Sequence, residues 1–176
     1  PIIEQEAIEA ELVFINDGSK DGTLERLLAL VAQDQRIRVI DLSRNFGKEA
    51  ALSAGIDEAH GDAIIPMDVD LQDPPELIGR FITLWREGYD VVYGVRQTRA
   101  SDGFSKRQSA CWFYALFNRL SAIEIPPNAG DFRLMDRRVA EVIRNLPERS
   151  RFMKGLFAWT GFKSIGVGYD RPTRVA

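Results

Sequence analysis

Short apolar runs alternate with segments of helical periodicity along the first part of the chain. Four runs have the length and composition of buried strands, and they cover residues 11–17, 37–42, 63–67 and 90–95. Three segments between them are alanine-rich or carry apolar side chains at helical spacing, at 24–31, 49–59 and 76–87. Strands that alternate with helices favour parallel pairing, so the pattern predicts an α/β fold with a mostly parallel sheet flanked by helices.

The second part of the chain is less regular. A polar segment at 96–107 precedes an aromatic run at 110–117, for which a core helix is the first interpretation and a helix resting against lipid the second. Asp136 can cap a following helix, and the basic segment 148–155 leads into another. Residues 163–169 predict a last strand.

Two carboxylates stand where the third predicted strand ends. Asp68 and Asp70 follow the run 63–67, and residues two apart on a strand face the same side. Asp73 and the residues after it predict a helix start, with an acidic N-cap and proline at the first helical position. The carboxyl ends of strands in open α/β sheets bind ligands, and oxygen ligands suit Mg²⁺ or Mn²⁺. A bare D-x-D is more often a solvated acidic turn, but this strand and helix start favour a metal site.

Charged turns also follow the first two predicted strands. Asp17 and Gly18 stand at the end of the first. Arg44 and Lys48 flank a glycine at the start of the helix that follows the second, where backbone N–H groups attract anions. A contact to a diphosphate and a solvated basic loop are equally good interpretations of this segment.

Composition limits the class of protein. The chain of 176 residues is long enough for one domain with a sizeable core. A single cysteine, Cys111, excludes an internal disulfide. His60, the only histidine, is interpreted as structural, which disfavours a histidine-based triad or a zinc site. No apolar run is long enough to span a bilayer.

Charge is distributed unevenly along the chain. Residues 1–95 hold 8 Lys and Arg against 19 Asp and Glu, a net charge of −11, whereas residues 96–176 hold 15 against 7, a net charge of +8. Chance is one explanation, and the functional one is an acidic half that holds a metal and a basic half that meets an anion. The basic residues show no zinc-finger or RNP-like pattern, so we expect no nucleic-acid partner.

Five segments together resemble the family 2 glycosyltransferases, of the GT-A fold, that move a sugar onto a polyprenyl phosphate. The segments are FINDGSKDGT, SRNFGKEAALSAG, DAIIPMDVDLQDPPE, GDFRLMDR and PERSRFMKG. Their order and spacing cover most of the chain, and the set is highly specific, whereas D-x-D alone is not. The chain looks most similar to bacterial bactoprenol glucosyltransferases, and less so to dolichyl-phosphate mannose synthases.

The resemblance implies a role for each acid of the first half. Asp17 matches an acid that holds the donor nucleoside, and we expect Gly18 and Lys48 beside it as further contacts to the nucleotide sugar. Asp68 and Asp70 match the D-x-D that binds Mg²⁺ or Mn²⁺ on the donor diphosphate. We therefore expect Asp68 to serve both metal and nucleotide sugar, and Asp70 to be essential for catalysis.

Asp131 matches an active-site acid near the reacting centre. A phosphate acceptor is mostly dianionic at neutral pH, because its second pKa is about 6, and it needs little help from a base. We therefore expect Asp131 to position a group, hold metal or stabilise developing positive charge, with base catalysis as its second role. The acceptor phosphate is expected to meet basic residues of the second half, namely Lys106, Arg107, Arg133, Arg149, Arg151 and Lys154.

The function implied is inverting transfer of a hexose from a nucleotide-diphosphate sugar to a polyprenyl phosphate, with undecaprenyl phosphate as the example. Glucose and UDP are the first expectations; mannose, galactose and a modified arabinose are the alternative sugars. The resemblance implies work at the membrane surface, on the cytoplasmic face of the inner membrane, and leaves a homo-oligomer open. Residues 1–176 are expected to form a single GT-A catalytic domain that lacks the first strand and the C-terminal membrane helices of the family.

Two other functions stay open at this point. The missing first strand favours a non-catalytic module that binds a nucleotide or a lipid phosphate. Haloacid-dehalogenase phosphatases and phosphotransferases also carry D-x-D after a strand, with the first acid as nucleophile. Gln72 stands where those enzymes usually have threonine or valine, which disfavours them. Dinucleotide binding is disfavoured because no G-x-G-x-x-G follows a strand.

Overall fold

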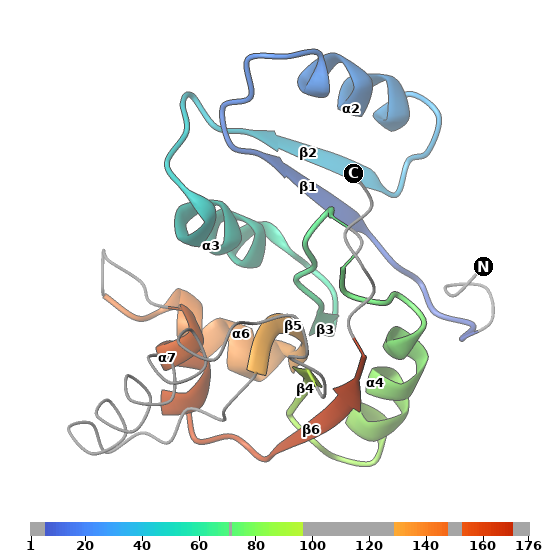
Figure 1. Ribbon diagram of the computed structural model, residues 1–176, viewed down its shortest axis with the longest axis vertical. Coiled ribbons are helices and arrows are strands. Elements are labelled where there is room, and N and C mark those ends of the chain that lie inside the picture. Colours follow the sequence, from blue (N-terminus) through green and yellow to red (C-terminus); the bar gives the residue numbers. More distant parts are fainter. Residues whose placement is uncertain (1–5, 71, 97–128, 148–152, 171–176) are drawn as a thin grey trace.

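The computed structural model describes residues 6–70, 72–96, 129–147 and 153–170. Strands and helices alternate along residues 12–96, as the sequence pattern predicts (Figure 1). Each element predicted there is confirmed to within one residue, except the strand that starts at residue 63, which ends three residues early. The aromatic run 110–117 lies outside the described residues. The elements are β1 (Leu12–Asn16), α2 (Thr23–Val31), β2 (Ile37–Asp41), α3 (Lys48–Glu58), β3 (Ala63–Ile64), α4 (Leu77–Arg86), β4 (Val91–Arg96), β5 (Ala129–Asp136), α6 (Arg137–Arg144), α7 (Met153–Trp159) and β6 (Ser164–Tyr169).

The described strands form two hydrogen-bonded groups. β1 and β2 pair in parallel, and the second group has the order β3-β5-β4-β6. β4 and β6 are parallel, whereas β5 runs antiparallel to both of its neighbours, β3 and β4. The expected sheet therefore carries one reversed strand, which the pattern could not reveal because the regular alternation of strands and helices ends at β4.

The reversal of β5 matters for the position of its acid. Ala129, at the start of β5, pairs with Val95 near the end of β4, and Met135, near the end of β5, pairs with Ile64 at the end of β3. Asp131 lies near the amino end of β5 and thus at the edge where β4 ends. A strand that runs backwards brings this acid to the edge at which parallel strands present their ligand-binding residues.

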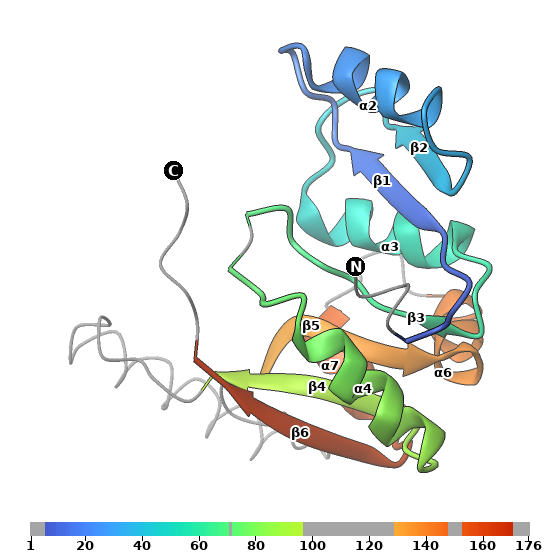
Figure 2. The same cartoon turned by 90° about the vertical axis from the view of Figure 1, so that its right-hand side faces the viewer.

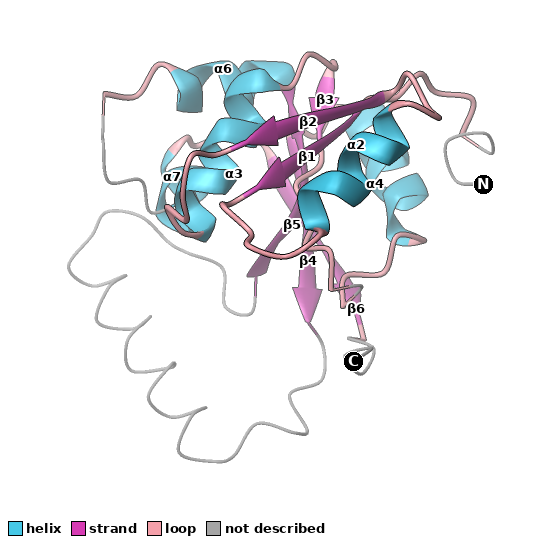
Figure 3. Ribbon diagram, turned by 90° about the horizontal axis from the view of Figure 1, so that it is seen from above, coloured by secondary structure: helices cyan, strands magenta, loops and turns pink. Residues whose placement is uncertain are grey.

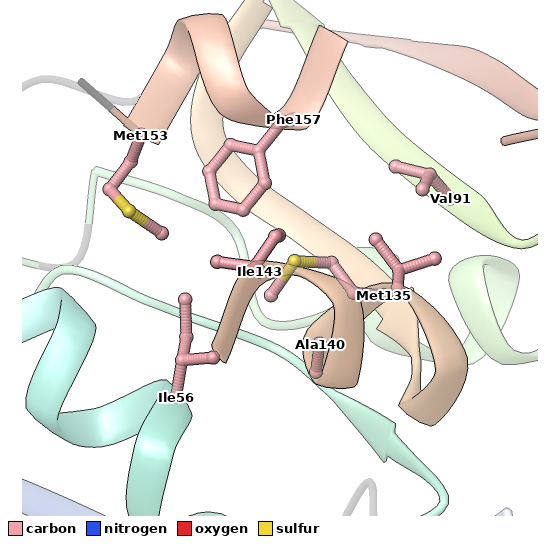
Figure 4. Packing of buried hydrophobic residues seen from close by; sticks show 8 residues of the cluster. Ile56, Val91, Met135, Ala140, Ile143, Met153 and Phe157 are labelled. Atoms are coloured by element: carbon pink, nitrogen blue, oxygen red, sulfur yellow. The ribbon is translucent and has the colours of Figure 1, made fainter. Parts of the chain in front are cut away.

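Helices cover both faces of the four-stranded sheet (Figures 2 and 3). On one face, Phe81 of α4 packs with Phe132 and Leu134 of β5. On the other, α6 and α7 pack against the sheet together with Ile56 of α3, and Figure 4 shows these side chains meeting around Met135. α3 also contacts β1, so it joins the two groups of strands. None of the helices that the structure describes is both long and apolar enough to cross a lipid bilayer.

The start of α4 differs from the sequence prediction. Asp73 is not the N-cap, because α4 begins at Leu77 after a turn in which the Leu77 N–H donates to the carbonyl of Pro74. The carboxylate of Asp73 is instead buried and accepts a hydrogen bond of 2.7 Å from the hydroxyl of Tyr169, at the end of β6. The sequence spacing predicted that Asp73 caps the helix next to it. The buried Asp73 carboxylate requires a hydrogen-bond donor, and in the structure the hydroxyl of a residue distant in sequence supplies it.

Replacing Tyr169 by phenylalanine should therefore destabilise the protein. The change keeps the ring, which meets Phe132 edge-on, and removes the hydroxyl that donates to the buried Asp73 and accepts a longer bond from Arg96. We expect a loss of about 1.5–3 kcal/mol in the free energy of unfolding, the usual range for hydrogen bonds to charged groups. Urea denaturation of Tyr169→Phe measures the loss, with Tyr89→Phe as the matched control, and equal stability of the two variants would contradict the assigned bond.

Candidate functional site

Lys48 joins two of the predicted site acids. Its ammonium nitrogen lies 2.7 Å from Oδ2 of Asp68 and 2.8 Å from Oδ2 of Asp131. Burial lowers the pKa of Lys48, but the hydrogen bonds to Asp131 and Asp68 outweigh this effect and hold its pKa above the ordinary value. The three residues come from α3, from the loop after β3 and from β5, so the fold brings together charges that are far apart in sequence.

Asp17 fixes the loop that directly precedes Lys48. Its two carboxylate oxygens accept hydrogen bonds from the backbone N–H groups of Phe46, at 2.7 Å, and of Gly47, at 2.9 Å. Asp17 was expected to hold the donor nucleoside, and in this structure its carboxylate holds the residues that precede α3. It therefore sets the direction in which Lys48 leaves the backbone.

Gly18 is needed because two loops approach each other closely. It has φ of +65°, and a Cβ atom built on it would lie 2.4 Å from the backbone carbonyl carbon of Arg44. A side chain there would both strain the backbone and push the two loops apart. Gly18 was expected to contact the nucleotide sugar, and its visible task is to allow the Asp17 loop to reach the start of α3.

Asn16 and Asp41 belong to the same framework and were not singled out from the sequence. Asn16, at the end of β1, is buried and donates through Nδ2 to Oδ1 of Asp41, at the end of β2, over 2.7 Å. Its own Oδ1 accepts from the N–H of Ser19 at 3.3 Å. Polar residues at two adjacent strand ends are the available sequence signal, but their pairing requires the parallel register of β1 and β2.

The D-x-D residues lie in a loop instead of on a strand. Asp70 accepts a hydrogen bond of 3.2 Å from the backbone N–H of Gln72, and Val69 between the acids is 85% exposed. Among the described residues, no group of three or more His, Cys, Asp or Glu side chains gathers closely enough to hold a metal ion. The structure thus brings Asp68, but not Asp70, together with Asp131.

A divalent cation nevertheless suits the residues around Lys48. The Asp68 and Asp131 oxygens both lie within 2.8 Å of one nitrogen atom, so they flank a position that a positive charge already occupies. Both are hard carboxylate oxygens, the ligand type that Mg²⁺ and Mn²⁺ prefer. Asp68 and Asp131 are therefore the side chains of this structure that could hold such a cation, if the ammonium group moves away.

Arg133 follows Asp131 by two residues on β5 and is buried. It is 5% exposed, its Nη2 donates to the Gly130 carbonyl at 2.6 Å, and its guanidinium lies 3.8 Å from the ring centroid of Phe157. Burial lowers the pKa of Arg133 to about 10, and the charge of Asp131 opposes that change. Asp131 and Arg133 are two residues apart on β5 and so share a face of the strand, but the guanidinium is enclosed in the protein and not presented to solvent.

Arg96 is a further basic residue of the site that the sequence did not single out. It ends β4, its Nε donates to the hydroxyl of Tyr169 at 3.4 Å, and a Cβ atom built on Gly130 would lie 3.5 Å from its Nη2. The pKa of Arg96 is lowered by burial and raised by its bond to Tyr169 and by nearby acids including Asp131, with a net increase. No motif contains Arg96, so only the pairing of β4 with β5 reveals its place.

Most of the basic residues expected to meet the acceptor phosphate fall outside the part of the chain that the structure describes. Lys106, Arg107, Arg149 and Arg151 belong to this set. Lys154 lies in the first turn of α7. Their proposed role rests on the sequence.

The fold and the site together define the class of protein. The α/β fold with acids gathered at the ligand-binding edge of its sheet agrees with the GT-A fold expected from the sequence, and the reversed β5 is a feature that the structure adds. The solved structure of the mannosyltransferase PcManGT from Pyrobaculum calidifontis, in complex with GDP-Man and Mn²⁺, is similar to this chain with a TM-score of 0.61. The similarity covers 99% of this chain and 54% of the other at 16% identity, so it supports the fold alone.

The sequence matches Glycosyl transferase family 2 over residues 2–144, and the chain belongs to this family. A glycosyltransferase from Synechocystis is 54% identical over 95% of this chain and 52% of its own length. The bactoprenol glucosyl transferase of Shigella phage SfX is 51% identical over 98% of this chain and 57% of its own length. The chain thus spans about half the length of the curated relatives it matches.

Proposed function

We propose that the protein transfers a hexose, with glucose as the first choice, from a UDP-sugar to a polyprenyl phosphate such as undecaprenyl phosphate. The observation that carries the proposal is the 51% identity, over 98% of this chain, to relatives named bactoprenol glucosyl transferases. A family 2 domain with acids and a lysine gathered at the carboxyl edge of its sheet is consistent with that chemistry.

The reaction exchanges one phosphate oxygen for another at the sugar. An oxygen of the polyprenyl phosphate attacks the anomeric carbon from the face opposite the nucleotide, and the bond from that carbon to the diphosphate oxygen breaks. The nucleoside diphosphate leaves with the electron pair, and the configuration at the carbon inverts. The attacking phosphate is mostly dianionic at neutral pH, so no protein base has to remove a proton.

The donor diphosphate is proposed to lie beside α3 and the D-x-D loop. Asp17, Gly18 and Lys48 would form the nucleotide-sugar side. Asp68 would hold Mg²⁺ or Mn²⁺, with Asp70 as the second ligand that the resemblance implies and Asp131 as the second ligand that the structure offers. A bound divalent cation would offset the negative charge that builds on the departing diphosphate. The acids Asp68 and Asp131 suit such a cation for the geometric reason given above.

The acceptor is proposed to meet the basic half of the chain at the membrane surface, on the cytoplasmic face. Arg149, Arg151 and Lys154 are the first candidates for the phosphate, with Lys106 and Arg107 beside the isoprenoid chain. Arginine suits such a site because its planar guanidinium can donate two parallel hydrogen bonds to one phosphate. Arg133 would contribute its positive charge to this region without contacting the phosphate directly, because its side chain is enclosed.

The test is transfer of labelled sugar to a lipid. The purified protein is incubated with UDP-glucose, UDP-galactose or GDP-mannose, undecaprenyl phosphate in detergent micelles, and Mn²⁺ or Mg²⁺. We expect label in the lipid fraction with UDP-glucose, dependence on added lipid phosphate, and loss of transfer in EDTA. Nucleotide binding without transfer from any donor would overturn the proposal in favour of a non-catalytic module, and release of inorganic phosphate alone would indicate a phosphatase.

A further inference from the structure

The ammonium group of Lys48 already stands between Asp68 and Asp131, the two acids that could hold a metal cation. The ammonium group of Lys48 lies within hydrogen-bonding distance of Asp68 on one side and Asp131 on the other. Asp68 and Asp131 contribute Oδ2 atoms to the same nitrogen, so a metal ion bound between these two oxygens would take the place of the ammonium group. The ammonium and a divalent cation thus compete for the same ligands.

The Lys48 side chain can leave this position while the backbone of the preceding loop and of α3 stays folded. Its side chain is 53% exposed, and its backbone is the first residue of α3, held from behind by the hydrogen bonds of Asp17 to Phe46 and Gly47. A four-carbon stem on a fixed backbone can swing while the loop and the helix stay in place. The positive end of the dipole of this eleven-residue helix would also attract an anion.

A nucleoside diphosphate supplies what the lysine loses on leaving. Its phosphate oxygens carry negative charge that can accept the ammonium group, while the same phosphates complete the shell of a metal ion held by few protein carboxylates. Without the diphosphate, a metal ion must displace the lysine into water and overcome the loss of two ion pairs. With it, the lysine exchanges carboxylate partners for phosphate partners.

We propose that Lys48 is an internal counter-cation which keeps metal from binding to Asp68 and Asp131 until a nucleoside diphosphate draws it away. The inference rests on the proposed function for the identity of the diphosphate, and it concerns the order and coupling of binding instead of the transfer step. Metal and nucleotide then bind with positive coupling, and by linkage each raises the affinity of the other by the same factor.

The experiment measures Mn²⁺ binding by electron paramagnetic resonance and calorimetry, with and without saturating UDP, in the wild type and in Lys48→Met. For the wild type we expect Mn²⁺ to bind at least about tenfold more tightly when UDP is present, a coupling of ordinary size for linked sites. In Lys48→Met, Mn²⁺ alone should bind about tenfold more tightly than it does to the wild type. UDP should bind more weakly to the variant, and the coupling should shrink to less than about threefold.

Two further variants keep the result interpretable. Lys48→Gln removes the charge but keeps a hydrogen-bond donor, so it should behave as Lys48→Met does even where the methionine variant fails to fold. Lys163→Met removes a lysine that lies over Tyr89 before β6 and should leave Mn²⁺ binding as in the wild type. Thermal unfolding of each variant shows that it is folded before titration.

The outcomes separate this inference from the proposed function. Unchanged or weaker Mn²⁺ binding by both folded Lys48 variants, in the absence of UDP, would overturn the counter-cation role even if the wild type transfers sugar. Tighter Mn²⁺ binding with lost coupling would support that role even if no lipid acceptor is glycosylated, in which case only the proposed function fails.

Discussion

Asp131→Asn should lower kcat for sugar transfer by about 10²–10³-fold, the range found when one preorganised electrostatic group is removed from an active site. Asparagine keeps the size and the polarity of the side chain but removes its charge. Asp131 is 20% exposed, it contacts Lys48, and it stands at the sheet edge where the reaction is proposed to take place. A group that stabilises positive charge on the sugar acts mainly in the transition state, so kcat should fall much more than donor affinity.

The measurement compares initial rates of lipid glycosylation with calorimetric affinities for UDP. Asp62→Asn, an exposed acid before β3, is the matched control and should retain wild-type kcat. A kcat within about threefold of the wild type for Asp131→Asn would exclude a direct role of this carboxylate. A fall in donor affinity without a fall in kcat would assign it to the nucleotide side.

Phe132→Ala should cost about 3–5 kcal/mol in the free energy of unfolding, the usual range for a fully buried aromatic residue. Phe132 is completely buried on the face of β5 that packs against α4, with its ring centroid 4.9 Å from that of Phe81. Removing the ring leaves a cavity between the sheet and α4, on the face of β5 opposite to that of the neighbouring Asp131. The strand that carries the acid would lose its main support on that face.

Urea denaturation followed by circular dichroism measures this loss. Leu28→Ala is the control, because Leu28 is also a large apolar residue in an ordered element but is 54% exposed on α2. It should change the stability by less than about 1 kcal/mol, since surface substitutions outside special features have small effects. A loss of similar size for both variants would show that the β5–α4 layer is not the core of the domain.

Local pattern was enough to predict most elements of the first part of the chain. β1, β2 and α4 each have an apolar pattern that only one kind of element can bury, and the periods of two and of 3.6 residues are read directly from sequence. Residues 129–136 were not predicted as a strand, and the direction of β5 was not accessible in this way either, because a strand's pattern is the same whichever way it runs. Its orientation follows from the pairing with β3 and β4 and not from its own residues.

The candidate site was predictable as a set of residues but not as an arrangement. Asp68, Asp131 and Lys48 were each expected at the site, yet the sequence assigned the lysine to a diphosphate and paired Asp68 with Asp70. The structure pairs Asp68 with Asp131 through Lys48. Arg96 and the Tyr169–Asp73 bond were missed, since their partners lie on strands that are distant in sequence.

The sequence by itself determined the family, the alternating elements and the identity of the acids, because motif spacing and hydrophobic period are properties of consecutive residues. The tertiary structure decided which of those charges meet. The reversed β5 brings Asp131 to the edge where Lys48 and Asp68 lie, and the same strand turns Arg133 into the interior against Phe157. Charge interactions depend on distance and burial, and both are set by how strands pair and helices pack, not by the order of residues along the chain.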